Sequence, residues 1–162
     1  MKRIWIALLA LTMLLSLAAC GEKKQFSDNV AANELADHTL AALSDGVDYT
    51  TAQSGYLDDY FLTPSYVSDA TVRFATDANN LNEFGIFHVS SDKVKDMETL
   101  LKDYLKKSYE ANQAWYDSYI PAETPKLRDA EVKRIGNYVL YAIASPSDRT
   151  AFFEAAEAKL TE

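Results

Sequence analysis

The sequence of 162 residues contains one cysteine, five glycines and four prolines, and basic side chains are fewer than acidic ones. A single thiol excludes an intramolecular disulfide, and so little glycine and proline excludes collagen-like and low-complexity chains. The 16 Lys and Arg residues against 24 Asp and Glu residues give a net charge of −8. This charge argues against nucleic-acid binding, because neutralising phosphates requires clustered basic side chains. The length and the 48% hydrophobic content fit one folded domain with its own core.

The N-terminus has the pattern of a bacterial secretion signal. Lys2 and Arg3 precede an apolar run over residues 4–17, which is short for a membrane-spanning helix. The run ends in Leu17-Ala18-Ala19-Cys20, which resembles the lipobox of bacterial lipoproteins. In such proteins the thiol receives a diacylglycerol and the chain is cut before the cysteine. We therefore predict that Cys20 is lipidated and anchors the protein to the outer face of the cytoplasmic membrane.

Three regions follow from this prediction. Residues 1–19 form the signal peptide that is removed, residues 20–26 form the lipidated N-terminus and tether, and residues 27–162 form a single extracytoplasmic domain. Residues 1–19 hold two of the 16 basic side chains and none of the acidic ones, so the remaining chain has a net charge of −10. An acidic domain of this kind is repelled by anionic surfaces, and we expect it to stand away from the membrane.

Hydrophobic periodicity and cap residues predict the elements of the domain. In chain order they are a helix from Ser27 to a stop at Gly46, strands 70–76 and 84–89, a long helix that follows residues 90–92 and ends before Pro121, a loop over 121–125, strands 131–135 and 138–144, and a last helix capped by Ser147. Residues 49–66 are rich in tyrosine and interrupted by Pro64, and they receive no assignment. Gly136-Asn137 is a two-residue hairpin turn.

A weak internal repeat suggests how these elements combine. Residues 69–73 align with residues 129–133, residues 84–89 align with residues 138–143, and each pair of strands leads through Ser and Asp residues into an amphipathic helix. We expect an α+β fold in which two strand-strand-helix units form a four-stranded antiparallel sheet, with both helices on one face and an additional N-terminal helix.

No catalytic constellation is visible in the sequence. The two histidines, His38 and His88, are separate, and zinc sites need three or four ligands. His38 is expected on a solvated helix surface and His88 on the outward face of a strand. Gly-x-Ser-x-Gly, P-loop, dinucleotide-binding and EF-hand patterns are absent. The sequence thus predicts no cofactor and no metal, and it favours a non-catalytic role while leaving catalysis open.

Tyrosine is the most informative residue type, with ten in the chain. Tyr104 and Trp115 lie on the apolar stripe of the long helix, where core packing is expected. Exposed tyrosines often mark interfaces or sugar contacts, since the ring is apolar and the hydroxyl polar. We consider Tyr56, Tyr60 and Tyr66, together with His88, as a candidate interaction patch.

Several segments resemble one family. The lipobox, residues 82–87, the long helix, residues 119–123 and residues 136–139 are together similar to small lipoproteins of Firmicutes that carry domain of unknown function 4358 (DUF4358). The resemblance covers the chain from about Ser27 onward and implies an extracytoplasmic, membrane-anchored domain. It supplies no catalytic residue, cofactor or substrate.

Three kinds of function remain open. The first is a non-catalytic binding or adaptor module that presents its surface to a protein or glycan of the cell envelope. The alternatives are an accessory protein or enzyme of envelope polysaccharide modification, and an inhibitor-like domain that blocks an extracellular hydrolase. A pocket with a perturbed carboxyl group would support the enzyme.

Overall fold

The computed structural model describes residues 24–61 and 65–162. The predicted signal peptide and Cys20 lie outside the described residues. The elements in chain order are α2 (Ala32–Leu40), β1 (Tyr49–Thr51), α3 (Ser54–Phe61), β2 (Val67–Ala75), β3 (Glu83–Val89), α4 (Val94–Tyr119), α5 (Thr124–Arg128), β4 (Glu131–Ile135), β5 (Tyr138–Ile143) and α6 (Pro146–Leu160). In this part of the chain, no helix combines the length and apolar character needed to cross a membrane.

The strands form one antiparallel sheet in the order β1-β2-β3-β5-β4. The α+β class is as predicted, but the four-stranded sheet was wrong by one strand. The fifth strand, β1, comes from the tyrosine-rich segment that received no assignment. Its three residues pair at the sheet edge, from Tyr49 opposite Ala75 to Thr51 opposite Arg73. So short a strand has no periodicity of its own, and it is fixed by its partner β2.

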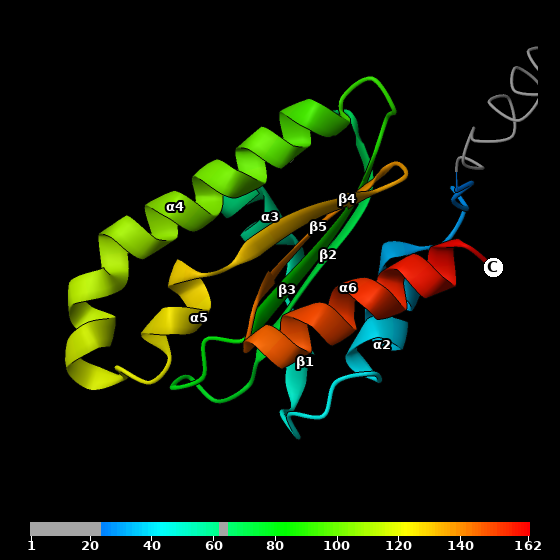
Figure 1. Cartoon of the computed structure of the whole chain (residues 1–162). Helices are drawn as coiled ribbons and strands as arrows, with labels where there is room; N and C mark the ends of the chain where they lie inside the picture. The colour runs from blue at the N-terminus through cyan, green and yellow to red at the C-terminus, as the bar shows by residue number, and fades with distance from the viewer. Residues whose placement is uncertain (1–23, 62–64) are drawn as a thin grey trace, which may run out of the picture.

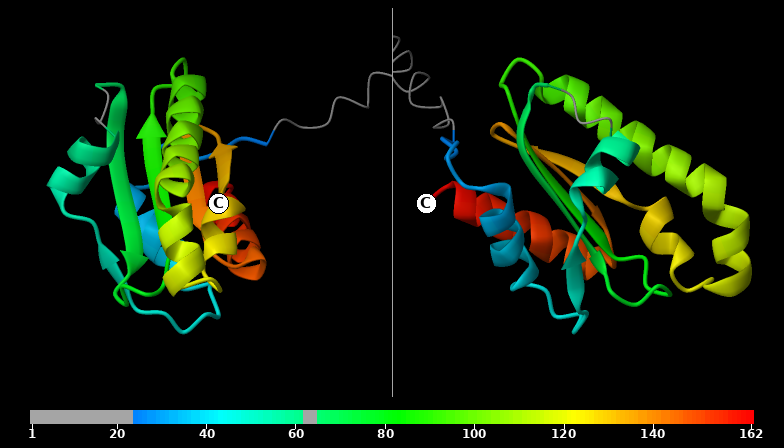
Figure 2. Two further views of the ribbon diagram at one scale, coloured as in Figure 1. Left: turned by 90° about the vertical axis from the view of Figure 1, so that its left-hand side faces the viewer. Right: turned by 180° about the vertical axis from the view of Figure 1, so that it is seen from behind.

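The helices cover both faces of the sheet, which corrects the prediction that they share one face. Helices α2 and α6 pack on one side, and α3, α4 and α5 lie on the other (Figures 1 and 2). The reason lies in the central strand β5, where all six residues are buried. A strand that is apolar on both sides needs cover on both sides. The two strand-strand-helix units are present, but their helices diverge to opposite faces.

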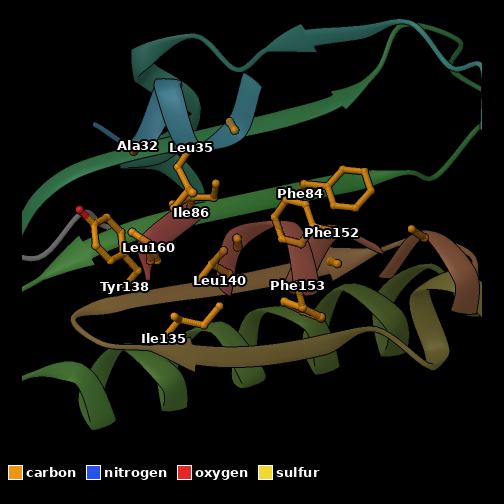
Figure 3. Packing of buried hydrophobic residues seen from close by; sticks show 14 residues of the cluster. Ala32, Leu35, Phe84, Ile86, Ile135, Tyr138, Leu140, Phe152, Phe153 and Leu160 are labelled. Carbon is orange, nitrogen blue, oxygen red and sulfur yellow. The ribbon is translucent and has the colours of Figure 1, made fainter. Parts of the chain in front are cut away.

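Two hydrophobic clusters result. The cluster beneath α2 and α6 contains Leu35, Phe84, Leu140 and Phe152, as Figure 3 shows. The cluster beneath α4 contains Phe87, Met97, Leu101, Val139 and Tyr141. Both share the central strands β3 and β5, whose alternate residues point to opposite sides.

The first helix is shorter than predicted because its cap comes from a distant strand. The backbone N–H of Ala32 donates to Asp69 Oδ2 of β2 at 2.7 Å, and Ala31 is extended. Residues 27–30 instead lie against the sheet, where Tyr138 Oη donates to the Val30 carbonyl at 2.7 Å and accepts from its N–H at 3.0 Å. A carboxylate at a helix N-terminus satisfies an otherwise unpaired N–H group.

Two smaller details also differ from the prediction. The expected loop at 121–125 contains the start of α5. Helix α6 is capped by Ser145 rather than Ser147, because the Ser145 hydroxyl accepts from the N–H of Asp148 at 3.2 Å, with Pro146 in the first turn. The long helix ends before Pro121 as expected.

Candidate ligand-binding cleft around Glu83

Glu83 is the first residue of β3, and its side chain lies on the face covered by α3 and α4. Three tyrosines donate hydrogen bonds to its carboxylate. Tyr104 of α4 and Tyr141 of β5 both donate to Oε1, the former at 2.8 Å, and Tyr56 of α3 approaches Oε2 at 3.4 Å. The cluster thus joins three elements that are far apart in the sequence. We call Glu83, Tyr56, Tyr104 and Tyr141 the Glu83 cluster.

Gly85 makes this arrangement possible. It lies opposite Tyr141 in the pairing of β3 with β5, and the Tyr141 ring crosses over it to reach Glu83. A Cβ atom on Gly85 would stand 2.0 Å from Cε1 of Tyr141, inside the ring's van der Waals surface. Glycine is therefore needed here for the close approach of an aromatic ring.

The phenol rings also contact one another. The hydroxyl oxygens of Tyr56 and Tyr104 are 3.1 Å apart. The rings of Tyr56 and Tyr60 stack with centroids 4.5 Å apart, and the rings of Tyr104 and Tyr141 lie 5.7 Å apart at a tilt. These contacts hold the aromatic walls around the carboxylate.

Burial and hydrogen bonding act on the pKa of Glu83 in opposite directions. Burial raises the pKa of Glu83, and the hydrogen bonds from Tyr141, Tyr104 and Tyr56 oppose that rise. Burial and the nearby Glu83 charge raise the pKa of Tyr141 well above its ordinary value, so the phenol stays a donor. In the described part of the chain, no basic side chain forms an ion pair with Glu83.

A partly open cleft of about 280 Å³ lies above Glu83 between α3, α4 and the sheet. Its aromatic walls are Tyr56, Tyr60, Tyr104 and Tyr116, and Leu81, Leu127 and Ile143 line its apolar side. Ser108 and Asn112 add polar groups from α4. Small-molecule sites combine an apolar wall with a few such polar groups, and this volume lies near their lower limit.

The cleft continues as a stripe along α4. Tyr104, Ser108, Asn112, Trp115 and Tyr119 recur at three- and four-residue steps and therefore share one helix face. Trp115 is 51% exposed and Tyr119 is 70% exposed, with their rings stacked at 4.9 Å. The expectation that Trp115 packs into the core was wrong, because α4 extends beyond the sheet at this end (Figure 1). We call Trp115 and Tyr119 the aromatic platform.

The structure separates the four residues of the predicted patch. Tyr56 and Tyr60 lie together at the cleft, and Tyr60 is 59% exposed. Tyr66 precedes β2 near Lys93, at the opposite end of the same face. His88 lies on the other face of the sheet, stacked on Tyr138.

His88 was predicted on the outward face of a strand, but it is half-buried and contacts the N-terminal segment. Its Nε2 lies 2.7 Å from Asp28 Oδ1, its Nδ1 lies 2.9 Å from the Ser68 hydroxyl, and its side chain is 20% exposed. The ring thereby holds the N-terminal segment against the sheet. His38 is exposed on α2, and the described residues contain no group of three or more His, Cys, Asp or Glu side chains that could hold a metal.

The sequence pattern did not predict the centre of the site. It gave no role to Glu83, which lies within the similar segment 82–87, and Tyr141 falls in the predicted strand 138–144. A signal was present: an acidic residue opens an apolar strand, and a glycine follows two positions later on the same face. Nothing in the sequence placed Tyr141 opposite that glycine.

The fold and the cleft define a small α+β domain with an antiparallel sheet between two helical layers. The family described as Domain of unknown function (DUF4358) matches residues 50–144, and the chain belongs to this family. The match confirms the predicted DUF4358 family and includes every residue that lines the cleft. No curated protein and no solved structure matches the chain.

Proposed function

We propose that the protein is a non-catalytic binding module of the cell envelope, lipidated on Cys20 and held at the outer face of the cytoplasmic membrane. Its binding surface is the cleft above Glu83 together with the aromatic platform on α4. The observation that carries the proposal is this open, tyrosine-lined cleft with a carboxylate at its floor. The partner is a protein or glycan of the envelope.

The attachment of the N-terminal segment supports an orientation in which the cleft faces away from the membrane. The Ser27 N–H donates to the Leu160 carbonyl at 2.7 Å, and Asp28 contacts His88 near the end of β3. The four steps along the chain from Cys20 to Lys24 span at most about 14 Å. Glu83 lies five residues from His88 along β3, about 17 Å away. A lipid on Cys20 would therefore leave the cleft at the end of the sheet remote from the membrane.

The aromatic platform supports a partner that offers flat apolar faces. The stacked rings of Trp115 and Tyr119 are exposed beside polar Asn112, and tryptophan and tyrosine are enriched in interfaces. Sugar rings and aromatic or aliphatic side chains both present such faces. The net negative charge argues against a nucleic acid as partner.

The anchor is tested by the Cys20→Ala substitution. We expect it to abolish incorporation of labelled palmitate and to release the protein from membranes, because the thiol is the lipid attachment point. A wild-type protein that takes up no label would contradict the anchor.

The binding surface is tested by a photo-crosslinking residue placed at Trp115 in intact cells. A matched control carries the same residue at Ala158, which is exposed on α6 across the sheet. We expect an envelope component to be captured at Trp115 and not at Ala158. Equal capture at both positions, or no capture at either, would refute the proposal that this surface binds the partner.

A second candidate is an enzyme or accessory protein of envelope polysaccharide modification. The specific observation in its favour is the raised pKa of Glu83 in a cleft, as in acid catalysts. Among the described residues that line the cleft, however, Glu83 is the one carboxylate, whereas glycoside hydrolysis uses two. An inhibitor-like domain is the remaining alternative, and a captured hydrolase would distinguish it.

A further inference from the structure

The two carboxylate oxygens of Glu83 differ in how well they are satisfied. Oε1 accepts hydrogen bonds from both Tyr104 and Tyr141. In the described structure, the one hydrogen bond to Oε2 is the long 3.4 Å contact from Tyr56. A carboxylate oxygen can accept about two hydrogen bonds, and a good one from a hydroxyl is closer to 2.7 Å. Oε2 therefore retains acceptor capacity beside the cleft.

The walls around this oxygen suit a cation. Tyr56 and Tyr60 from α3 and Tyr104 and Tyr116 from α4 line the cleft, and the faces of aromatic rings attract positive charge. Leu81, Leu127 and Ile143 offer apolar surface on the remaining side. In the described residues, no Lys or Arg lines this cleft to neutralise Glu83. A ligand with one positive group and a short apolar chain would complement all three features.

We propose that the cleft binds a primary alkylammonium group, which donates to Oε2 of Glu83 while its chain lies against the apolar wall. The proposal rests on the proposed function and names the chemical class of the ligand that the cleft takes. The oxygens of Ser108 and Asn112 stand at the same cleft and supply further acceptors for an ammonium, which has three donors. An anionic ligand would be repelled by Glu83.

A bare metal ion fits the site less well. Calcium takes six to eight oxygen ligands and zinc takes four ligands of His, Cys or carboxylate type. The cleft offers one carboxylate, and the described residues contain no cluster of three or more such groups. A single carboxylate among aromatic rings is instead the pattern that recognises organic ammonium ions.

Binding should release a proton. Burial raises the pKa of Glu83, and the groups that face it are the phenols of Tyr56, Tyr104, Tyr116 and Tyr141. A bound cation favours the ionised carboxylate and lowers that pKa again. Near the pKa of the free site, the protein therefore loses a proton as the ammonium enters. A purely structural Glu83 would show no such coupling.

The test is isothermal titration of the full-length protein in non-ionic detergent with n-butylammonium chloride, and with n-butanol as the neutral probe of similar shape. We expect saturable binding of butylammonium and binding of butanol that is about tenfold to a hundredfold weaker, from the loss of one charged hydrogen bond. Repeating the titration in buffers of different ionisation enthalpy should show proton release. Equal affinity for both probes, or no saturable binding of butylammonium at millimolar concentration, would overturn the proposal.

Variants locate the binding. Glu83→Gln keeps the shape of the side chain and should weaken butylammonium binding at least about tenfold, with proton release abolished. Glu110→Gln removes a carboxylate from an exposed position on α4 outside the cleft and is the matched control. If Glu83→Gln does not fold, Tyr60→Ala at the exposed rim serves in its place and should weaken binding severalfold. Unchanged affinity in the folded cleft variant would overturn the proposal.

The two proposals fail in different ways. Envelope capture at Trp115 without butylammonium binding would leave the binding module intact and refute the ammonium ligand. Butylammonium binding without envelope capture would leave the ligand chemistry intact and refute the envelope partner.

Discussion

The Gly85→Ala substitution perturbs the Glu83 cluster with a single methyl group. The new Cβ would lie 2.0 Å from Cε1 and 2.6 Å from Cδ1 of Tyr141. Tyr141 is fully buried among neighbouring side chains. The ring must therefore shift and carry its hydroxyl away from Glu83.

The expected cost has three contributions. Inserting a methyl group into a packed core costs about 1–3 kcal/mol. Losing the hydrogen bond from Tyr141 to a buried carboxyl group costs about 1–3 kcal/mol more. Alanine is better than glycine in a strand by roughly 0.5–1 kcal/mol, which offsets part of the loss. We expect the free energy of unfolding to fall by about 1–5 kcal/mol, which lowers the melting temperature by roughly 3–20 °C.

Urea denaturation and thermal melting followed by circular dichroism measure this loss. Gly55→Ala is the matched control, because no atom lies within 4 Å of its added Cβ in α3 and alanine favours a helix. We expect Gly55→Ala to leave stability unchanged or slightly higher. In a Tyr141→Leu background, Gly85→Ala should cost less than about 1 kcal/mol, because the clashing ring is gone. A Gly85→Ala protein as stable as the wild type, or an equal cost in the Tyr141→Leu background, would refute the contact between Gly85 and Tyr141.

Three further outcomes follow from single contacts. Since burial raises the pKa of Glu83, its contribution to stability is present below the ordinary value of 4.5 and is lost as pH rises through the raised value. The free energy of unfolding of the wild type should therefore fall relative to Glu83→Gln as pH rises above 4.5, and a difference independent of pH in urea titrations would contradict the shift. Tyr138→Phe removes both hydrogen bonds to Val30, so we expect a loss of about 1–3 kcal/mol and faster hydrogen exchange at the Val30 amide, whereas unchanged exchange would show that other contacts hold the segment. Ser145→Ala should cost about 1 kcal/mol in urea denaturation and Ser147→Ala less, and the reverse order would mean that Ser147 caps α6.

The sequence was most reliable where local pattern decides structure. The strand over 131–135, the Gly136-Asn137 turn and the following strand agree with β4 and β5, with Gly136 at φ +60°. The long helix has the amphipathic period that predicted it. These elements depend on neighbours in the chain, so periodicity and turn chemistry are enough to find them.

Predictions from the sequence were wrong where contacts between distant segments decide the structure. The edge strand β1 exists because β2 pairs with it, and α2 begins at Ala32 because Asp69 caps it. The distribution of helices over both faces had a signal in the fully apolar strand β5, which alternates no polar residues. The internal repeat instead predicted that both helices lie on one face.

The sequence by itself determined the α+β class, the acidic character of the domain, the family and the prediction of a lipid anchor at Cys20, because each depends on composition or on a short motif. Only the tertiary structure brought Glu83 together with Tyr56, Tyr104 and Tyr141, which lie between 21 and 58 residues away in the chain. Their meeting depends on sheet register, on the absence of a side chain at Gly85 and on the packing of α3 and α4 over β3. Such contacts form when layers pack, and no local pattern in the sequence specifies them.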